Sequence, residues 1–178
     1  MIKSKILLIC LSVYCLGVHA QSLKISAKDS EVKFVIKNLG VSTTGQFKDI
    51  EGSIEFVTSD LSRSSFNVTV LTNSLDTDNN LRDKHLSKDG YFDTAKYPRM
   101  RFISAKVTGK QGNYVMEGNL TIKDITKPIT FPFTATRQDN GYIFKGSFDL
   151  NRRDFGVGGK SLTMSDKLTV NLSVSALK

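Results

Sequence analysis

The polar segment of residues 76–93 carries the side chains that could do chemistry. Arg82, Asp83 and His85 fall within four positions of one another, and His85 is the only histidine after residue 20. A histidine oriented by a carboxylate can activate a serine or cysteine nucleophile. However, the sequence has no Gly-x-Ser-x-Gly elbow, and its two cysteines both lie within the first twenty residues. The partner that nucleophilic catalysis needs is therefore missing.

Three hypotheses for this segment stay open. In the first, hydrogen bonds of Arg82 and Asp83 hold a short helix at the rim of the fold, and Leu86 and Phe92 fill the core. In the second, Arg82, Asp83 and His85 form a polar gate that meets the polar end of a ligand. The third, a hydrolase or isomerase that uses His85, is weaker, because one histidine has neither a nucleophile nor further metal ligands beside it. We predict no catalytic residue, no metal site and no cofactor.

The first twenty residues have the pattern of a secretory signal peptide. Lys3 and Lys5 precede an apolar run over residues 6–16, and Val18 and Ala20 supply small residues at the usual cleavage positions. The run is shorter than the roughly 20 apolar residues of a membrane-spanning helix. The sequence thus predicts a cleaved signal peptide at residues 1–20, a single domain at residues 21–178, and a periplasmic or secreted protein.

Cleavage would remove both cysteines and leave 158 of the 178 residues, enough for one hydrophobic core without disulfides. It would also lower the formal net charge from +8 to +6, because two lysines are lost. The remaining basic residues are interleaved with acids, as in Arg82-Asp83-Lys84, whereas a nucleic-acid-binding protein gathers them on one face. We predict no nucleic-acid partner, and the basic charge indicates a solvated exterior or, as the alternative, transient contact with an anionic membrane.

Apolar and polar side chains alternate with a period of two over most of the chain, which indicates β-strands with one apolar face. The clearest stretch is residues 114–135, interrupted by a polar turn at residues 124–127. One helix is expected over residues 79–88, with Asp78 as its N-cap and Gly90 after its end. A turn is expected at residues 49–52. Further strands, about eight or nine in all, are expected at residues 32–37, 44–47, 54–57, 66–72, 100–102, 142–150 and 168–176.

Many antiparallel strands with a single apolar face indicate an all-β fold, either a closed barrel or a sandwich. A barrel of about eight strands is just wide enough to be filled by its own side chains or to hold one slender ligand. Eight of the eleven phenylalanines fall on the apolar parity of the expected strands, which suits a solid core or a tunnel. The residues expected to line a hydrophobic tunnel are Phe34, Ile36, Phe56, Phe66, Val68, Phe92, Phe102, Met116, Leu120, Phe131, Phe133, Phe144 and Phe148.

A series of short motifs also occurs in a recognisable order. They are Val41-Ser-Thr-Thr-Gly-Gln-Phe47, Glu51-Gly-Ser-Ile54, Leu75-Asp-Thr77, Arg82-Asp-Lys-His-Leu86, Tyr91-Phe-Asp93, Tyr97-Pro98 ahead of Phe102, Gly118-Asn-Leu-Thr-Ile-Lys-Asp-Ile-Thr-Lys-Pro128 and Arg153-Asp-Phe-Gly156. Together they resemble the YceI-like family of exported lipid-binding proteins, over essentially all of residues 21–178. The chain departs from that family at Ile125, where relatives usually have a glycine-containing turn, and at Arg99 and Arg101, where they tend to be more neutral.

The resemblance implies an extended, lipocalin-like, eight-stranded antiparallel barrel with one short helix at the rim. It implies a long polyisoprenoid or other aliphatic lipid inside the barrel, and no catalytic residue. The resulting hypothesis is non-enzymatic binding, storage or transport of such a lipid in the periplasm. The alternative is a structural or interaction module with a solidly packed barrel and no ligand. Whether the chain forms a homodimer stays open, as do the length and head group of the lipid.

Overall fold

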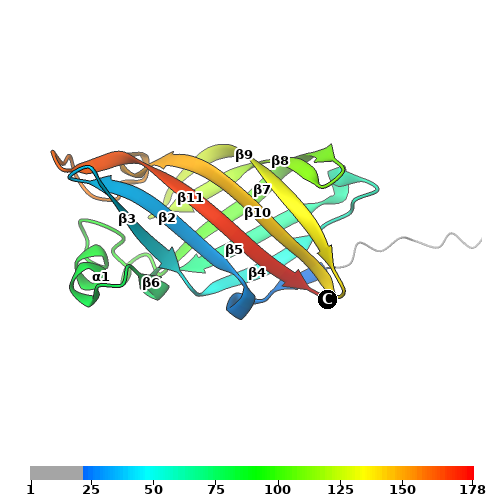
Figure 1. Cartoon of the computed structure of the whole chain (residues 1–178), viewed down its shortest axis with the longest axis horizontal. Coiled ribbons are helices and arrows are strands. Elements are labelled where there is room, and N and C mark those ends of the chain that lie inside the picture. The colour runs from blue at the N-terminus through cyan, green and yellow to red at the C-terminus, as the bar shows by residue number, and fades with distance from the viewer. Residues whose placement is uncertain (1–21) are drawn as a thin grey trace, which may run out of the picture.

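The period-two alternation becomes eleven antiparallel strands in the computed structural model, which describes residues 22–178 (Figure 1). The expected signal peptide at residues 1–20 lies outside the described residues. Within residues 22–178 no helix is long and apolar enough to cross a membrane. The strands are β1 (Ser22–Ile25), β2 (Glu31–Asn38), β3 (Val41–Phe47), β4 (Ile50–Glu55), β5 (Ser65–Leu71), β6 (Leu75–Asp76), β7 (Arg99–Lys110), β8 (Asn113–Ile122), β9 (Ile125–Gln138), β10 (Gly141–Asn151) and β11 (Met164–Leu177).

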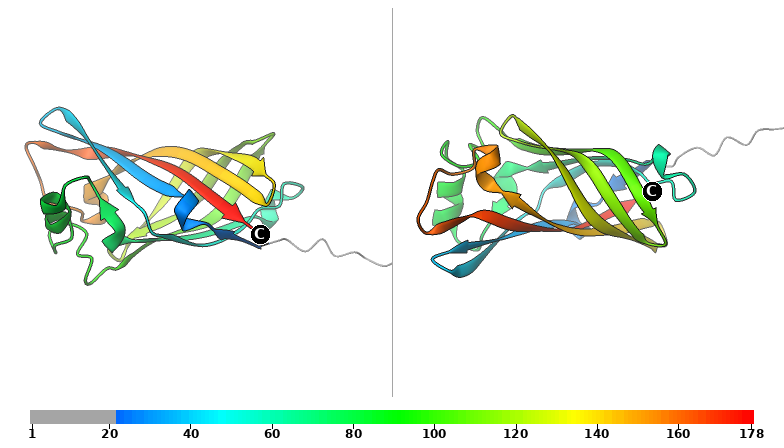
Figure 2. Two further views of the ribbon diagram at one scale, coloured as in Figure 1. Left: turned by 60° about the horizontal axis from the view of Figure 1, so that its bottom comes forward. Right: turned by 90° about the horizontal axis from the view of Figure 1, so that it is seen from above.

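Eight of these strands close into the predicted barrel. The hydrogen-bonded order runs β1-β4-β5-β7-β8-β9-β10-β11, and β1 pairs with both β4 and β11 to complete the ring. Beyond β1, the 3₁₀ turn η1 (Ala27–Asp29) leads to β2, which continues along the same edge of β11. The hairpin of β2 and β3 therefore lengthens one end of the barrel, where β6 pairs briefly with β3 (Figure 2). The expected eight-stranded antiparallel barrel is confirmed.

The interior follows the alternation that the sequence shows. On β8, Tyr114, Met116, Gly118 and Ile122 are buried whereas Val115, Glu117 and Asn119 are exposed, and Phe131 and Phe133 of β9 are also buried. A register shift on β7 between Ser104 and Lys106 changes the inward parity along that strand. One face of nearly every strand thus contributes to a continuous apolar interior.

The N-terminal half of the barrel departs from the expected element boundaries. The expected turn at residues 49–52 is wrong, because Ile50 begins β4 and is only 2% exposed. Gly52 has φ +136°, and a Cβ there would lie 2.1 Å from the carbonyl oxygen of Asn67 on β5. The glycine thus allows two strands to approach closely rather than reverse the chain. β1 was not expected, since its four residues are too few to show a clear period.

The helix is shorter than expected and begins one residue later. Helix α1 spans Asn80–Leu86, and its N-cap is Asn79, whose side chain accepts a hydrogen bond from the backbone N–H of Arg82. Asp78 instead has φ +57°, and its N–H donates to the carboxylate of Asp76. The 3₁₀ turns η2 (Leu61–Arg63), η3 (Thr72–Ser74) and η4 (Arg152–Phe155) complete the described elements.

The β8–β9 hairpin turns at Lys123 and Asp124, which have φ values of +50° and +61°. Ile122 pairs with Ile125, so the loop has two residues, and both adopt the left-handed conformation that such turns usually assign to Asn and Gly. The departure at Ile125 therefore lies at the first position of β9, one residue past the turn.

Candidate ligand cavity

A cavity of about 260 Å³ lies inside the barrel. It is larger than an engineered apolar cavity of roughly 150 Å³ that accepts benzene. Twelve of the thirteen residues expected at a tunnel line it: Phe34, Ile36, Phe66, Val68, Phe92, Phe102, Met116, Leu120, Phe131, Phe133, Phe144 and Phe148. Apolar residues that sequence analysis did not select also line it, among them Val32, Phe47, Ile54, Leu150, Phe155, Leu168, Val170, Leu172 and Val174. The interior is thus hollow and almost entirely apolar.

The cavity is long and narrow. Its lining runs along β11 from Val174 to Leu168 and continues along β2 from Ile36 to Asn38. These eight residue steps cover about 20 Å along the axis of a barrel with tilted strands. One acyl chain of a bilayer spans about 15 Å, half of a hydrocarbon core of about 30 Å. The cavity therefore has the reach for a chain longer than one lipid tail.

Glycines on the inward face explain why the barrel is hollow although many phenylalanines point into it. A Cβ on Gly45 would lie 2.3 Å from Cζ of Phe34, the residue paired with it on β2. A Cβ on Gly118 would lie 2.4 Å from Cζ of Phe102, and one on Gly146 would lie 3.2 Å from Cδ2 of Phe131. Each ring thus occupies space beside a glycine that a side chain would otherwise fill, which keeps it near the wall and leaves the axis open.

Gly45→Ala should displace the Phe34 ring from the wall into the cavity. The three atoms nearest to the added methyl group belong to the side chains of Phe34 and Thr77, so the backbone can stay in place. Overpacking of this kind costs about 1–3 kcal/mol of stability. If the ring takes the space of two ligand methylenes, affinity for an apolar ligand should fall about tenfold. Urea unfolding and titration with a fluorescent fatty acid measure the two effects.

Gly90→Ala is the matched control, because no atom lies within 4 Å of a Cβ at Gly90. The double variant Gly45→Ala/Phe34→Leu should recover affinity, since the smaller side chain leaves room for the new methyl group. Unchanged affinity in Gly45→Ala would show that the Phe34 ring does not border the occupied part of the cavity.

Six aromatic side chains close the end of the barrel near the C-terminus. We call Phe56, Phe66, Tyr114, Phe133, Tyr142 and Phe144 the aromatic plug. The Phe56 ring lies 5.2 Å from the rings of Tyr114, Tyr142 and Phe144, in edge-to-face contacts. Phe66, Phe133 and Phe144 also line the cavity, so they form its blind end.

Phe56, the thirteenth residue expected at the tunnel, does not line the cavity. It follows the last residue of β4 and keeps the inward parity of Ile54, so its side chain is buried. Its ring instead packs behind Phe66 and Phe144, on the side of the plug away from the cavity.

At the other end, α1 and the segment before it cap the barrel (Figure 1). The carboxylate of Asp83 accepts from the backbone N–H of Thr77 at 3.0 Å and from its hydroxyl at 2.6 Å. Arg82 donates from Nε to the Thr77 hydroxyl at 2.8 Å and from its terminal nitrogen to the Thr77 carbonyl. Leu86 and Phe92 turn into the cavity. These contacts match the hypothesis of a helix held at the rim by Arg82 and Asp83.

The residues of the expected polar gate lie in different places. Arg82 lines the cavity, Asp83 is bonded to Thr77 and does not line it, and His85 is exposed with its ring 4.8 Å from that of Tyr91. The i, i+3 spacing puts Arg82 and His85 on the same side of α1, but the Arg82 guanidinium turns to Thr77 while the His85 ring packs beside Tyr91. His85 therefore faces solvent and borders the cavity only through Tyr91, which does line it.

Two further hydrogen bonds hold the cap to the barrel, and a third joins the two barrel loops that make them. Lys123, at the β8–β9 turn, donates through Nζ to the carbonyls of Asp89 at 3.1 Å and Gly156 at 3.0 Å. The N–H of Gly158 donates to the carbonyl of Gly90 at 2.9 Å. The segment after α1 is thus bonded to two separate loops of the barrel rim.

An ion pair fixes β6 beside the junction of β3 and β4. Lys48 Nζ lies 2.6 Å from the Asp76 carboxylate. The hydrogen bond from Lys48 lowers the pKa of the Asp76 carboxyl below its usual value, and the same bond raises the pKa of Lys48. Both groups remain charged near neutral pH, which keeps β6 and the start of the cap in position.

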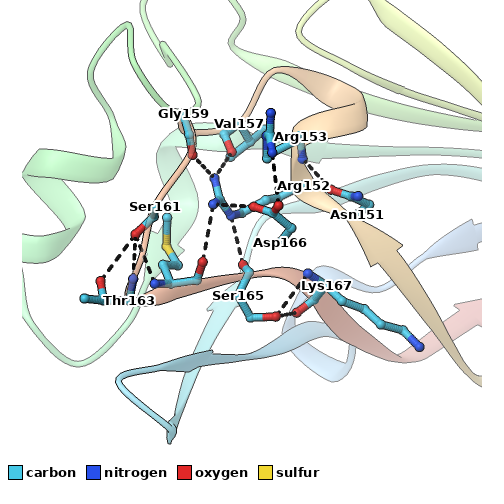
Figure 3. A network of polar contacts seen from close by, with 11 residues as sticks. Asn151, Arg152, Arg153, Val157, Gly159, Ser161, Thr163, Ser165, Asp166 and Lys167 are labelled. Atoms are coloured by element: carbon cyan, nitrogen blue, oxygen red, sulfur yellow. Dashed lines mark hydrogen bonds and ion pairs between the residues drawn. The ribbon is translucent and has the colours of Figure 1, made fainter.

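Arg152 is a buried cation at the wall of the cavity, and sequence analysis did not select it. Its guanidinium donates to the carbonyls of Ser165, Val157 and Gly159 at 2.9–3.0 Å and lies 2.7 Å from the Asp166 carboxylate (Figure 3). The signal was present in the sequence, because Arg152 continues the inward parity of Phe144, Phe148 and Leu150 past the end of β10. This network fixes the loop between η4 and β11.

The described residues show no arrangement for metal chemistry. No group of three or more His, Cys, Asp or Glu side chains within residues 22–178 is placed to hold a metal ion. What the geometry offers is an elongated apolar cavity with a blind aromatic end, a capped polar end and few polar groups along its wall.

Solved structures share this architecture. BcnA of Burkholderia cenocepacia superposes with a TM-score of 0.81 at 23% identity, over 86% of this chain and 99% of that one. A polyisoprenoid binding domain from Saccharophagus degradans, implicated in plant cell wall breakdown, has a TM-score of 0.71 at 14% identity, over 87% and 97%. At these identities the likeness shows the fold. The YCEI protein of Campylobacter jejuni is 28% identical with a TM-score of 0.68, over 75% and 84%.

Sequence comparison is more specific. A UPF0312 protein of Yersinia enterocolitica is 32% identical over 154 residues, which cover 83% of this chain and 80% of that protein. A UPF0312 protein of Yersinia pestis is 33% identical over the same shares. The model of the YceI-like domain matches residues 23–176, nearly the whole of the described barrel. The chain therefore belongs to the YceI-like family.

Proposed function

We propose that this protein binds a long-chain isoprenoid or other aliphatic lipid in the barrel cavity and stores or carries it without chemical change. The observation that carries the proposal is the cavity itself, which is apolar along about 20 Å of the barrel axis. A barrel packed solidly by its own phenylalanines, the alternative expected from sequence, would not leave this space. The name of the related domain from Saccharophagus degradans, a polyisoprenoid binding domain, supports the choice of ligand.

The energetics also fit a carrier of apolar chains. Burial contributes about 0.8 kcal/mol for each methylene group, so a long chain needs few polar contacts for high affinity. Ligand sites of this kind have mostly apolar walls and a few polar groups that fix orientation. Arg82 and Thr77, at the capped end, are among the polar residues of the lining that are placed to meet a head group. The proposed setting is the periplasm, on the basis of the signal-peptide pattern of residues 1–20.

Lipid extraction tests the proposal. The protein is purified without detergent from its own source, and the extract is analysed by mass spectrometry against an extract of an unrelated periplasmic protein treated identically. We expect one class of long-chain lipid at a fixed ratio to protein. Absence of such a lipid, together with no uptake of added prenol or fatty acid by the purified protein, would exclude the proposed function.

A further inference from the structure

The most exposed large apolar side chains gather at the capped end of the barrel. Leu39 is 75% exposed and Val41 67%, on either side of the β2–β3 turn, Leu81 on α1 is 80% exposed, and Leu162 before β11 is 100% exposed. Figures 1 and 2 show the β2–β3 hairpin tip, α1 and the loop before β11 at this same end. We call these four residues the apolar rim. We propose that the apolar rim docks on an anionic lipid bilayer.

Leu39 occupies a position that folding alone does not favour for leucine. It has φ +51° and is followed by Gly40 at φ +78°, the conformation of a two-residue hairpin turn that favours Asn-Gly. A leucine here gains no burial to offset its backbone strain. Its N–H donates to the carbonyl of Thr163 at 2.8 Å, which places the hairpin tip beside the loop that carries Leu162. Two apolar tips therefore project side by side.

The charges around the apolar rim suit an anionic surface. Residues 36–45 and 155–164 contain Lys37 and Lys160 and no acidic residue. On α1, exposed Lys84 lies one turn from Leu81, and exposed Lys88 follows the helix. Exposed Asp78 and Asp89 flank α1 and offset these two lysines, so the excess positive charge around the apolar rim comes from exposed Lys37 and Lys160. Basic residues near a membrane surface each contribute attraction to anionic lipids, and apolar side chains then enter the interface.

The docking face is also the cavity's polar end. Asn38 and Met164, which pair at the base of the two tips, line the cavity, as do Leu86 and Tyr91 of the cap. A barrel docked through its apolar rim would bring this end of the cavity against the bilayer, where a lipid could pass between them with little exposure to water. The docking proposal adds this membrane partner to the proposed lipid carrier.

Co-sedimentation with vesicles tests the docking. The full mature chain is mixed with vesicles of phosphatidylcholine alone or with added phosphatidylglycerol. We expect binding to the anionic vesicles that weakens as salt is raised. The triple variant Leu39→Ser/Leu81→Ser/Leu162→Ser should bind far more weakly, by about tenfold for each leucine that enters the interface. The control variant Ile103→Ser/Val115→Ser, on the barrel wall, should bind like the wild type.

Two outcomes would overturn the docking proposal. One is a wild-type chain that stays in the supernatant with anionic vesicles, and the other is a triple variant that binds as well as the wall variant. Loss of a dimer in the triple variant, without vesicle binding by the wild type, would assign the apolar rim to self-association instead. Titration with a fluorescent fatty acid in solution separates this result from the proposed function, since the triple variant keeps an intact cavity.

Discussion

Replacing Arg152 with methionine is expected to lower the free energy of unfolding by about 3–5 kcal/mol, a large share of the 5–15 kcal/mol typical of a domain. The Arg152 side chain is 3% exposed, and its guanidinium donates to three carbonyl oxygens as well as to the Asp166 carboxylate. Methionine fills a similar space but leaves these acceptors without their donor, and each buried acceptor so left costs about 1–3 kcal/mol. Urea unfolding at neutral pH measures the loss.

Arg153→Met is the matched control. Arg153 is adjacent in sequence and contacts the same Asp166 carboxylate at 3.2 Å, but its side chain is 47% exposed. An exposed ion pair of this kind contributes about 0–1 kcal/mol to the free energy of unfolding. Arg152→Lys should recover little of the lost stability. A planar guanidinium donates to carbonyls on several sides, and a lysine ammonium group cannot reach all of them. Equal losses in the Arg152 and Arg153 variants would mean that charge alone, rather than the buried network, stabilises the loop.

Strand alternation made most of the barrel interior predictable. In a closed barrel every strand has one inward face. The apolar alternation within each strand therefore predicted that Phe131 and Phe133, and likewise Val68 and Phe148, line the cavity wall. The same parity extends to Arg152 and Asn38, which line the cavity at the ends of β10 and β2. A basic residue at the next inward position after a run of alternating apolar residues, such as Arg152, thus indicates a buried cation.

Other features depend on contacts that no single strand encodes. The role of Gly45 follows from its pairing with Phe34, which only the register of two strands establishes. Phe56 keeps the inward parity of Ile54 and is buried, but Phe66 and Phe144 separate it from the cavity. The exposure of Leu162 follows from a loop whose path the Arg152 network sets. Sequence reasoning therefore identified the wall of the cavity better than its two ends.

Phe144→Ala is expected both to destabilise the barrel and to lengthen its cavity. Phe144 is 2% exposed, and its ring lies 5.2 Å from the rings of Phe56 and Phe66. Truncating a buried phenylalanine costs about 3–5 kcal/mol of stability, because the remaining plug closes only part of the space. Because Phe144 also lines the blind end of the cavity, the lost ring should admit a longer ligand. Urea unfolding measures the first effect.

Competition of fatty acids or prenols of increasing length against one fluorescent probe measures the second. The preferred length should shift upward in Phe144→Ala, because each added methylene that enters the opened space gains about 0.8 kcal/mol. Phe148→Ala is the control on the same strand and face: its ring stacks on Phe131 at 4.6 Å along the cavity wall, away from the plug. Its loss should widen the middle of the cavity and leave the preferred length unchanged. If both variants kept the wild-type preference for ligand length, the bound ligand would end short of the aromatic plug. Other residues of the cavity wall would then limit the chain length.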